Sequence, residues 1–397
     1  MKYSNKLKNL PPYIFAQLDS LIAEKKQAGQ EIYVLSKSDP DRPTDNLVVQ
    51  ALQEKAELAN NHHYPDFDGL LELRQSVSEW YATHYGVSLD SNSEILPLMG
   101  SKEGIVHFCQ AWLDHGDIAL LPDPAFPSYK TGTILAGGEP YFMPLRAPQF
   151  TPAFEDIPVD IAKKAKLMFL NYPNNPTGVT VTKEFWEEVL AFAREYDIIV
   201  ASDHAYSMTC FQPEAAPSIF TVDKNKENSI EFFTFSKAFH MAGWRLGIAV
   251  GNSEVIRGLK VIETHVNAGI FNPIQYAGAQ AFKLGLNQGF FDEDNRAYKE
   301  RLTLLVEFFN SMGWKLEVPK GTVYLWVPAP AGMNGEGFSK FLLDNARVVV
   351  SPGIAFGEEG RMYVRLCVTY QTEVIEKAIQ AISDVFREHN IQGPGTV

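Results

Sequence analysis

The stretch that decides the fold of this chain is FSKAFHMAGWRLG, residues 235–247. Apolar segments at residues 231–235 and 246–250 flank it, and their composition predicts two buried strands. A lysine held between buried strands loses hydration, so its pKa falls and it can act as a Schiff-base nucleophile. Lys237 has that position. Arg245 follows eight residues later, and the paired N–H groups of its guanidinium could bind a phosphate.

Length and composition exclude several classes of protein. A chain of 397 residues is long enough for two domains, and a net charge of −13 argues against nucleic acid or an anionic membrane as the main partner. The three cysteines, Cys109, Cys210 and Cys367, are too widely spaced for a disulfide framework or a zinc site, so we expect no metal. No secretory segment or apolar run of transmembrane length is visible, and we expect a cytoplasmic protein.

The order of expected elements divides the chain into three parts. Residues 1–45 form an arm that we expect to pack with the C-terminal part. Residues 46–290 alternate strands with helices, which predicts an α/β domain with a mostly parallel, doubly wound sheet. Residues 291–397 place long amphipathic helices around short strands, which indicates a smaller α+β domain. The expected strands of the large domain cover residues 94–98, 117–121, 166–170, 197–201, 231–235 and 246–250.

Polar side chains follow several of these strands, and ligands of open parallel sheets bind beyond the carboxyl ends of the strands. Gly100-Ser101-Lys102 lies between a strand and a helix, where free backbone N–H groups favour an anion. A plain strand–helix turn explains the same residues. Phe126 follows a strand on a proline-rich loop, and is either a core residue or an aromatic lid over a flat ring.

Two more strand ends carry groups that favour a site. Asn175 lies in a Pro-Asn-Asn-Pro-Thr-Gly turn, which turn chemistry alone explains, although proline on both sides favours a rigidly placed amide. Asp203 ends a buried strand, with Tyr206 three residues later. A buried carboxylate needs a positive or hydrogen-bonding partner, and a protonated pyridine nitrogen would serve. A helix N-cap is the alternative for Asp203, and we expect His204 to be structural.

The order of these groups along the chain resembles the site of the class I/II aminotransferases, which are pyridoxal-phosphate enzymes of fold type I. The resemblance covers nearly the whole chain, and its most specific parts are NNPTG at 174–178, SK at 236–237 and GWRLG at 243–247. It implies a mostly parallel doubly wound α/β sheet with a smaller α+β domain. Residues 10–15 and 39–44 look most like the branch of LL-diaminopimelate, alanine and aspartate aminotransferases.

The resemblance also implies a role for each group. Lys237 would form a Schiff base with pyridoxal phosphate and then carry the proton from the substrate Cα, while Asp203 would pair with the pyridinium nitrogen. Asn175 and Tyr206 would hydrogen-bond the ring oxygen, and Phe126 would stack on the ring. The phosphate would be held by Ser101, Lys102, Thr234, Ser236 and Arg245.

Three further residues concern the substrate and the partner subunit. Arg365 resembles the arginine that binds the substrate α-carboxylate in this family. Asn175 and Ser38 are expected to contact the substrate as well. The alternative for Arg365 is a cross-strand salt bridge. Ser38 stands where related enzymes usually have a glycine, so its side chain narrows the pocket. Tyr64 resembles a tyrosine that reaches the phosphate of the neighbouring subunit, which implies a homodimer with shared active sites.

The implied reaction is a ping-pong transfer of an amino group between an L-amino acid and a 2-oxo acid. A C–S β-lyase on the same scaffold stays open, because such a site activates the substrate Cα–H in either reaction. A ligand-sensing regulator is the third alternative, and we disfavour it because the arm is too short and too little basic to bind DNA. The sequence leaves the amino donor and the acceptor undefined.

Overall fold

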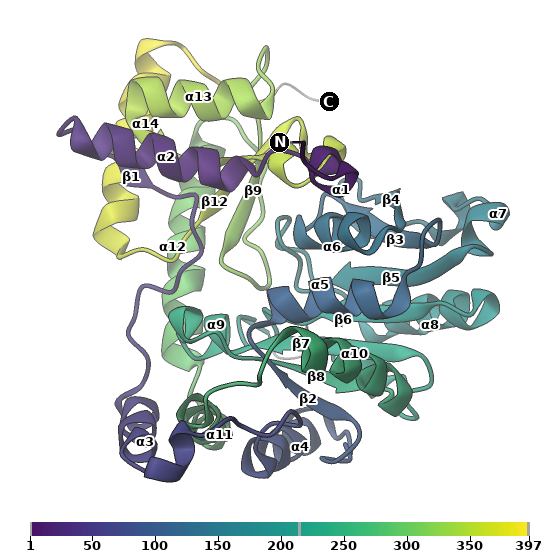
Figure 1. Ribbon diagram of the computed structural model, residues 1–397. Helices are drawn as coiled ribbons and strands as arrows, with labels where there is room; N and C mark the ends of the chain where they lie inside the picture. The colour runs from purple at the N-terminus through teal and green to yellow at the C-terminus, as the bar shows by residue number, and fades with distance from the viewer. Residues whose placement is uncertain (1, 213–215, 395–397) are drawn as a thin grey trace.

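The computed structural model describes residues 2–212 and 216–394, and its largest element is a seven-stranded sheet (Figure 1). The strand order is β2-β8-β7-β6-β5-β3-β4, with β8 antiparallel to both neighbours and every other pair parallel. This arrangement confirms the mostly parallel α/β sheet expected from the sequence. The strands are β2 (Ile95–Leu98), β3 (Ile118–Asp123), β4 (Glu139–Pro144), β5 (Ala165–Asn171), β6 (Ile199–Asp203), β7 (Ser229–Thr234) and β8 (Gly247–Gly251).

Helices bury both faces of this sheet, and the side chains of β5 show how. Leu167 and Phe169 pack into a cluster with α5 and α10, whereas Met168 and Leu170 pack into another with α4, α8 and α11. Successive strand residues point to opposite faces, so an all-apolar strand needs a helix layer on each side. The helices are α4 (Leu71–Tyr85), α5 (Ser101–Trp112), α6 (Ser128–Ala136), α8 (Lys183–Tyr196), α10 (Ser253–Val266) and α11 (Asn272–Gly285).

The C-terminal elements form a second assembly beside the large sheet (Figure 1). Strands β11 (Ser351–Pro352), β12 (Tyr363–Cys367) and β9 (Tyr324–Pro328) make a three-stranded antiparallel sheet. The N-terminal arm joins this assembly, because β1 (Tyr33–Val34) pairs with β10 (Val348–Val349) and Leu35 is buried in the same apolar cluster. The helices here are α2 (Ile14–Gln27), α12 (Asp292–Ser311), α13 (Gly335–Ala346) and α14 (Thr372–Glu388).

The structure differs from the expected elements in two places that matter. Lys237 lies on a one-turn helix, α9 (Phe235–Ala238), rather than on a plain loop, because Thr234 caps the turn by accepting the N–H of Ser236 at 3.2 Å. Strand β4 is not among the expected strands; it contains two prolines and lies at the sheet edge, where proline is tolerated. None of the described helices is long and apolar enough to cross a membrane.

Candidate active site

A cavity of about 390 Å³ lies at the carboxyl ends of β5, β6 and β7, between the large sheet and the C-terminal strands. Residues from the arm, the large sheet and β12 all line it, so it depends on how these parts pack together. The predicted site residues that line it are Ser38, Ser101, Lys102, Phe126, Asn175, Asp203, Tyr206, Thr234, Ser236, Lys237, Arg245 and Arg365. Tyr64 does not line it, and 88% of this residue's surface is exposed.

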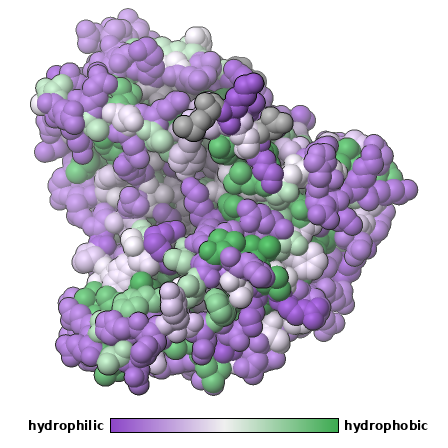
Figure 2. Space-filling view, viewed as in Figure 1, coloured by the Kyte–Doolittle hydropathy of each residue, from purple (hydrophilic) through white to green (hydrophobic). Residues whose placement is uncertain are grey.

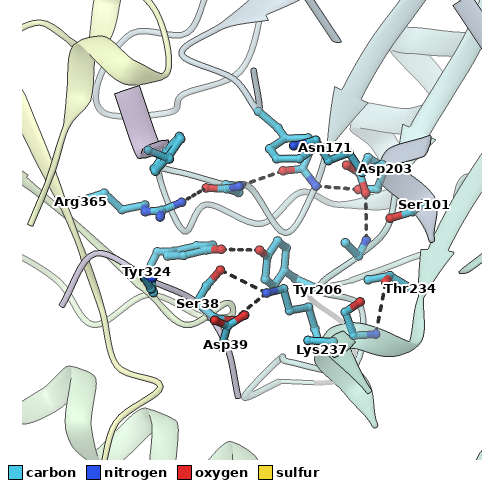
Figure 3. Close-up of a pocket in the computed structure, with 18 of the residues that line it drawn as sticks. Ser38, Asp39, Ser101, Asn171, Asp203, Tyr206, Thr234, Lys237, Tyr324 and Arg365 are labelled. Carbon is cyan, nitrogen blue, oxygen red and sulfur yellow. Dashed lines mark hydrogen bonds between the residues drawn. The ribbon is translucent and has the colours of Figure 1, made fainter. Parts of the chain in front are cut away.

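The amine of Lys237 points into the cavity toward the arm (Figure 3). Its Nζ atom donates to the backbone oxygen of Ser38 at 2.6 Å and to the hydroxyl oxygen of Ser38 at 3.1 Å. Burial lowers the pKa of Lys237, since a charged ammonium loses hydration there. The amine is therefore more easily neutral, and more nucleophilic, than that of a surface lysine.

The carboxyl group of Asp203 lies at the end of β6, deep in the cavity. Tyr129 donates its hydroxyl to Oδ2 at 2.6 Å, and the backbone N–H of Ala205 donates to Oδ1 at 3.3 Å. Burial raises the pKa of Asp203 to about 6, although the bond from Tyr129 opposes the rise. The helix N-cap alternative is wrong, because turns rather than a helix follow Asp203 at residues 205–208, and its carboxylate lines the cavity instead.

Two asparagines, one at the end of β5 and one in the turn after it, connect Asp203 with the opposite wall (Figure 3). Asn171 donates through Nδ2 to the backbone oxygen of Asp203 at 2.6 Å, and its Oδ1 accepts the N–H of Asn175 at 2.8 Å. The Oδ1 atom of Asn175 in turn accepts from Nη1 of Arg365 at 2.7 Å. The turn around Asn175 is therefore rigid, and its amide is placed inside the site rather than at the surface.

The guanidinium of Arg365 is a buried cation whose partners among residues 2–212 and 216–394 carry no formal charge. It donates to the side chain of Asn175 and, through Nη2, to the backbone oxygen of Ser36 at 3.0 Å. Its central carbon lies 4.2 Å from the ring centre of Tyr324 and 4.6 Å from that of Phe356. These neutral contacts leave its positive charge available to an anion in the cavity, which favours binding of a carboxylate over a cross-strand salt bridge.

A group of donors surrounds the start of α5, where the first backbone N–H groups have no partner within the helix. Gly100 has a φ of +95°, and a Cβ there would collide with the guanidinium of Arg245; a Cβ on Gly247 would collide with the N–H of Ser101. Gly100 thus lets Arg245 lie against the helix start, and Gly247 lets β8 approach the backbone of the same residues. With the hydroxyls of Ser101, Thr234 and Ser236 also lining the cavity, this corner has the donor set of a phosphate site.

The cavity has several residues that sequence reasoning missed. Tyr324 faces Tyr206, and their hydroxyl oxygens share a short hydrogen bond. Tyr13 accepts a hydrogen bond at 3.2 Å from Lys102, whose Nζ also lies 5.9 Å from the ring centre of Phe126. Among these residues, only Asn171 could have been predicted as a site residue from the sequence, because it directly precedes the turn that contains Asn175. The missed residues include Tyr13, Phe15, Asp19, Lys37, Asn171, Tyr324 and Phe356, which line the cavity, and Tyr129, which lies behind Asp203.

Comparisons with known proteins agree with this geometry. The sequence model of the family Aminotransferase class I and II matches residues 30–382. LL-diaminopimelate aminotransferase of Moorella thermoacetica is 44% identical to this chain, over 97% of this chain and 98% of the relative. LL-diaminopimelate aminotransferase of Aquifex aeolicus is 41% identical, over 97% of this chain and 99% of the relative. BacF of Bacillus subtilis has a similar structure, with a TM-score of 0.91 at 34% identity, covering 97% of this chain and 98% of its own.

Fold and site together define a transferase that works with pyridoxal phosphate, of fold type I. The chain belongs to the aminotransferase class I and II family. It is an aminotransferase, as the family match and the near full-length relatives establish. The residues present fit the cofactor: an easily neutralised amine on Lys237, a buried carboxyl on Asp203, and a corner where Gly100 lets the guanidinium of Arg245 lie against the start of α5.

Proposed function

We propose that this aminotransferase uses LL-diaminopimelate as amino donor and passes the amino group to a 2-oxo acid in a ping-pong reaction. The proposal of this substrate rests on the name shared by relatives that match nearly the whole chain at 39–44% identity. Those relatives give no support to the C–S β-lyase alternative.

The charges along the outer wall of the cavity support this substrate. LL-diaminopimelate carries an ammonium and a carboxylate at each end, so both ends need charged partners. Arg365 would take the carboxylate of the reacting end. Asp19 and Lys37, which form an ion pair at 2.8 Å, line the same cavity with Lys102. Asp19 would receive the distal ammonium, and Lys37 the distal carboxylate.

The residues of the chain would divide the work of the reaction as follows. Pyridoxal phosphate supplies an aldehyde that joins to amines and a ring that withdraws electrons from the substrate Cα. Lys237 would hold the cofactor covalently and, when free, take the proton from the substrate Cα on its Nζ. Asp203 would keep the ring nitrogen protonated, and Asn175 with Tyr206 would orient the ring oxygen.

Further contacts would hold the cofactor in place. The hydroxyls of Ser101, Thr234 and Ser236, with the side chains of Lys102 and Arg245, would bind the phosphate. Phe126 would cover the ring. Arg365, buried and without a charged partner of its own among the contacts described above, would orient the amino acid so that its Cα faces Lys237.

We also propose that the protein is a cytoplasmic homodimer in which Tyr64 reaches the phosphate of the partner subunit. Apolar side chains gather over α3 (Asn46–Ala56) and α11, at the lower left of Figure 2. Leu47, Leu58 and Phe271 are each at least 41% exposed there, and Phe271 lies 6.0 Å from the ring of His62, near Tyr64. An exposed apolar area of this kind suits a subunit interface.

A panel of single half-reactions tests the substrate. Purified protein loaded with pyridoxal phosphate is mixed with one amino acid at a time, and the change in visible absorbance reports amino-group transfer. We expect the largest kcat/KM for LL-diaminopimelate, and a loss of that preference in Asp19→Ala and Lys37→Ala. Equal rates with alanine, aspartate and LL-diaminopimelate would contradict the proposed donor.

A further inference from the structure

Residues 35–41, called the strap below, connect the arm to the rest of the chain across one side of the cavity (Figure 3). The strap is fastened to the C-terminal assembly at successive positions, and its backbone oxygens at 35, 36 and 37 all accept hydrogen bonds from that assembly. The donors are the N–H of Cys367 at 2.8 Å, Nη2 of Arg365 at 3.0 Å and Oγ1 of Thr369 at 3.2 Å. Asp41 adds a buried ion pair with Arg301 at 3.0 Å.

Ser38 is the strap residue that faces the large sheet. Both of its oxygen atoms accept from Nζ of Lys237, the backbone oxygen at 2.6 Å and the hydroxyl oxygen at 3.1 Å. Lys237 belongs to the short helix that follows β7, so these two bonds join the strap directly to the strand ends of the large sheet.

The two acceptors match what a neutral lysine amine offers. Such an amine has two N–H donors and one lone pair, so two acceptors on a single residue leave the lone pair free to take a proton. Burial has the largest effect on Lys237 and lowers its pKa; the cations Arg365 and Arg245 lower it further, whereas Asp39 opposes the fall. The amine is thus held in place without a carboxylate partner that would keep it protonated.

We propose that Ser38 is a positioning residue for Lys237: its two oxygens hold the lysine amine whenever that amine is not bonded to the cofactor, and the same contact fastens the strap across the cavity. The proposal rests on the role of Lys237 given above. It differs from a contact with the substrate carboxylate, which the sequence suggested for Ser38, because here the hydroxyl acts on the lysine.

The contact also depends on the chemical state of the lysine. When Lys237 is joined to the cofactor, its nitrogen no longer has two hydrogens to donate to Ser38. When the substrate releases the lysine, the freed amine regains both donors and can hold the strap. The strap would therefore be most firmly fastened during the step in which Lys237 moves the proton, which would help to keep water out of the cavity.

Hydrogen exchange in the cofactor-free protein tests the fastening without relying on catalysis. The exchange rate of the peptide covering residues 35–41 is compared in wild type, Lys237→Met, Ser38→Ala and Ser38→Thr, with Lys377→Met on the exposed face of α14 as control. We expect faster exchange in Lys237→Met and Ser38→Ala, and wild-type exchange in Ser38→Thr and the control. Unchanged exchange in both Lys237→Met and Ser38→Ala would overturn the proposal.

Kinetics of the loaded enzyme separate positioning from substrate binding. Because the hydroxyl contacts the lysine, Ser38→Ala should lower kcat about tenfold with little change in KM, and Ser38→Thr should restore kcat. A raised KM with unchanged kcat would overturn the positioning role in favour of a substrate contact. The exchange experiment contains no amino acid, so a wrong amino donor would leave its outcome unchanged.

Discussion

Asn175 and Arg365 are 190 residues apart in the sequence, and their side chains meet in a 2.7 Å hydrogen bond inside the cavity. One belongs to the turn after β5 of the large sheet, and the other to β12 of the C-terminal sheet. The bond fixes the amide that would face the cofactor relative to the cation that would face the substrate. In the proposed reaction, one junction between the two sheets would therefore set both the cofactor contact of Asn175 and the substrate contact of Arg365.

The first prediction concerns Arg365. Arg365→Ala should raise KM for the amino donor about 100-fold, because a charge-assisted, forked contact to the substrate carboxylate is lost. Retention of pyridoxal phosphate during gel filtration should change little. Arg365→Lys keeps the positive charge but loses the paired N–H donors of the guanidinium, so it should give an intermediate KM. If cofactor and substrate affinity fall together in both variants, Arg365 is a structural residue.

The second prediction concerns the pH dependence of cofactor binding. The pKa of Asp203 is raised to about 6 in the folded, cofactor-free protein, so this group becomes neutral as the pH falls through 6. Only the ionised carboxylate can pair with a protonated ring nitrogen, so affinity should be full above pH 6 and fall about tenfold per pH unit below it. Absorbance titrations with pyridoxal phosphate from pH 5 to 8 measure this.

Two variants separate Asp203 from the cofactor phosphate, which also titrates near pH 6. Asp203→Asn keeps the phosphate contacts, so the difference between its curve and that of wild type belongs to Asp203. Tyr129→Phe removes the 2.6 Å bond that favours the ionised form, and its midpoint should move to higher pH. Identical curves for wild type and Asp203→Asn would contradict the assigned role.

The third prediction concerns the phosphate corner. Gly100→Ala should weaken cofactor binding at least about tenfold, since a Cβ at φ +95° is strained and collides with Arg245. Gly116 is a matched control: its φ is +89°, but nothing lies within 4 Å of the added Cβ. Gly116→Ala should lower thermal stability yet leave the Kd for pyridoxal phosphate unchanged. Equal cofactor affinities in the two variants would contradict the assignment of the phosphate site to the start of α5.

The fourth prediction tests Tyr64 by mixing subunits. Lys237→Ala and Tyr64→Ala homodimers should both have low activity at limiting pyridoxal phosphate. A mixed dimer pairs the intact lysine of one subunit with the intact tyrosine of the other, so one site in two is complete. The purified mixed dimer should have about half the wild-type activity, and an equal mixture of subunits about a quarter. If Tyr64 acts within its own subunit, or the protein is a monomer, mixing restores nothing.

The sheet could be predicted from sequence because each of its central strands is a short apolar run followed by a polar loop. The groups at those strand ends, Asp203 and Asn175 among them, were recognisable for the same reason: their position relative to a strand is local information. Lys237 and Arg245 were likewise visible together on one short segment.

The wall opposite the sheet could not be predicted in the same way. Tyr324 and Phe356 reach the cavity only because the C-terminal sheet and the large sheet pack together, and nothing near them in sequence indicates this. Tyr129 is a buried helix residue whose hydroxyl matters only through its contact with Asp203. The partner of Ser38 depends on a contact between residues 199 positions apart.

Covalent attachment of the cofactor to Lys237 is the central claim, and one measurement tests it most directly. Protein loaded with pyridoxal phosphate is reduced with borohydride and digested, and mass spectrometry locates the modified lysine. We predict modification at Lys237 alone, with no visible cofactor band in Lys237→Ala at the position seen in wild type. Modification at Lys102, which lines the same cavity, or failure to take up the cofactor at all, would contradict the account.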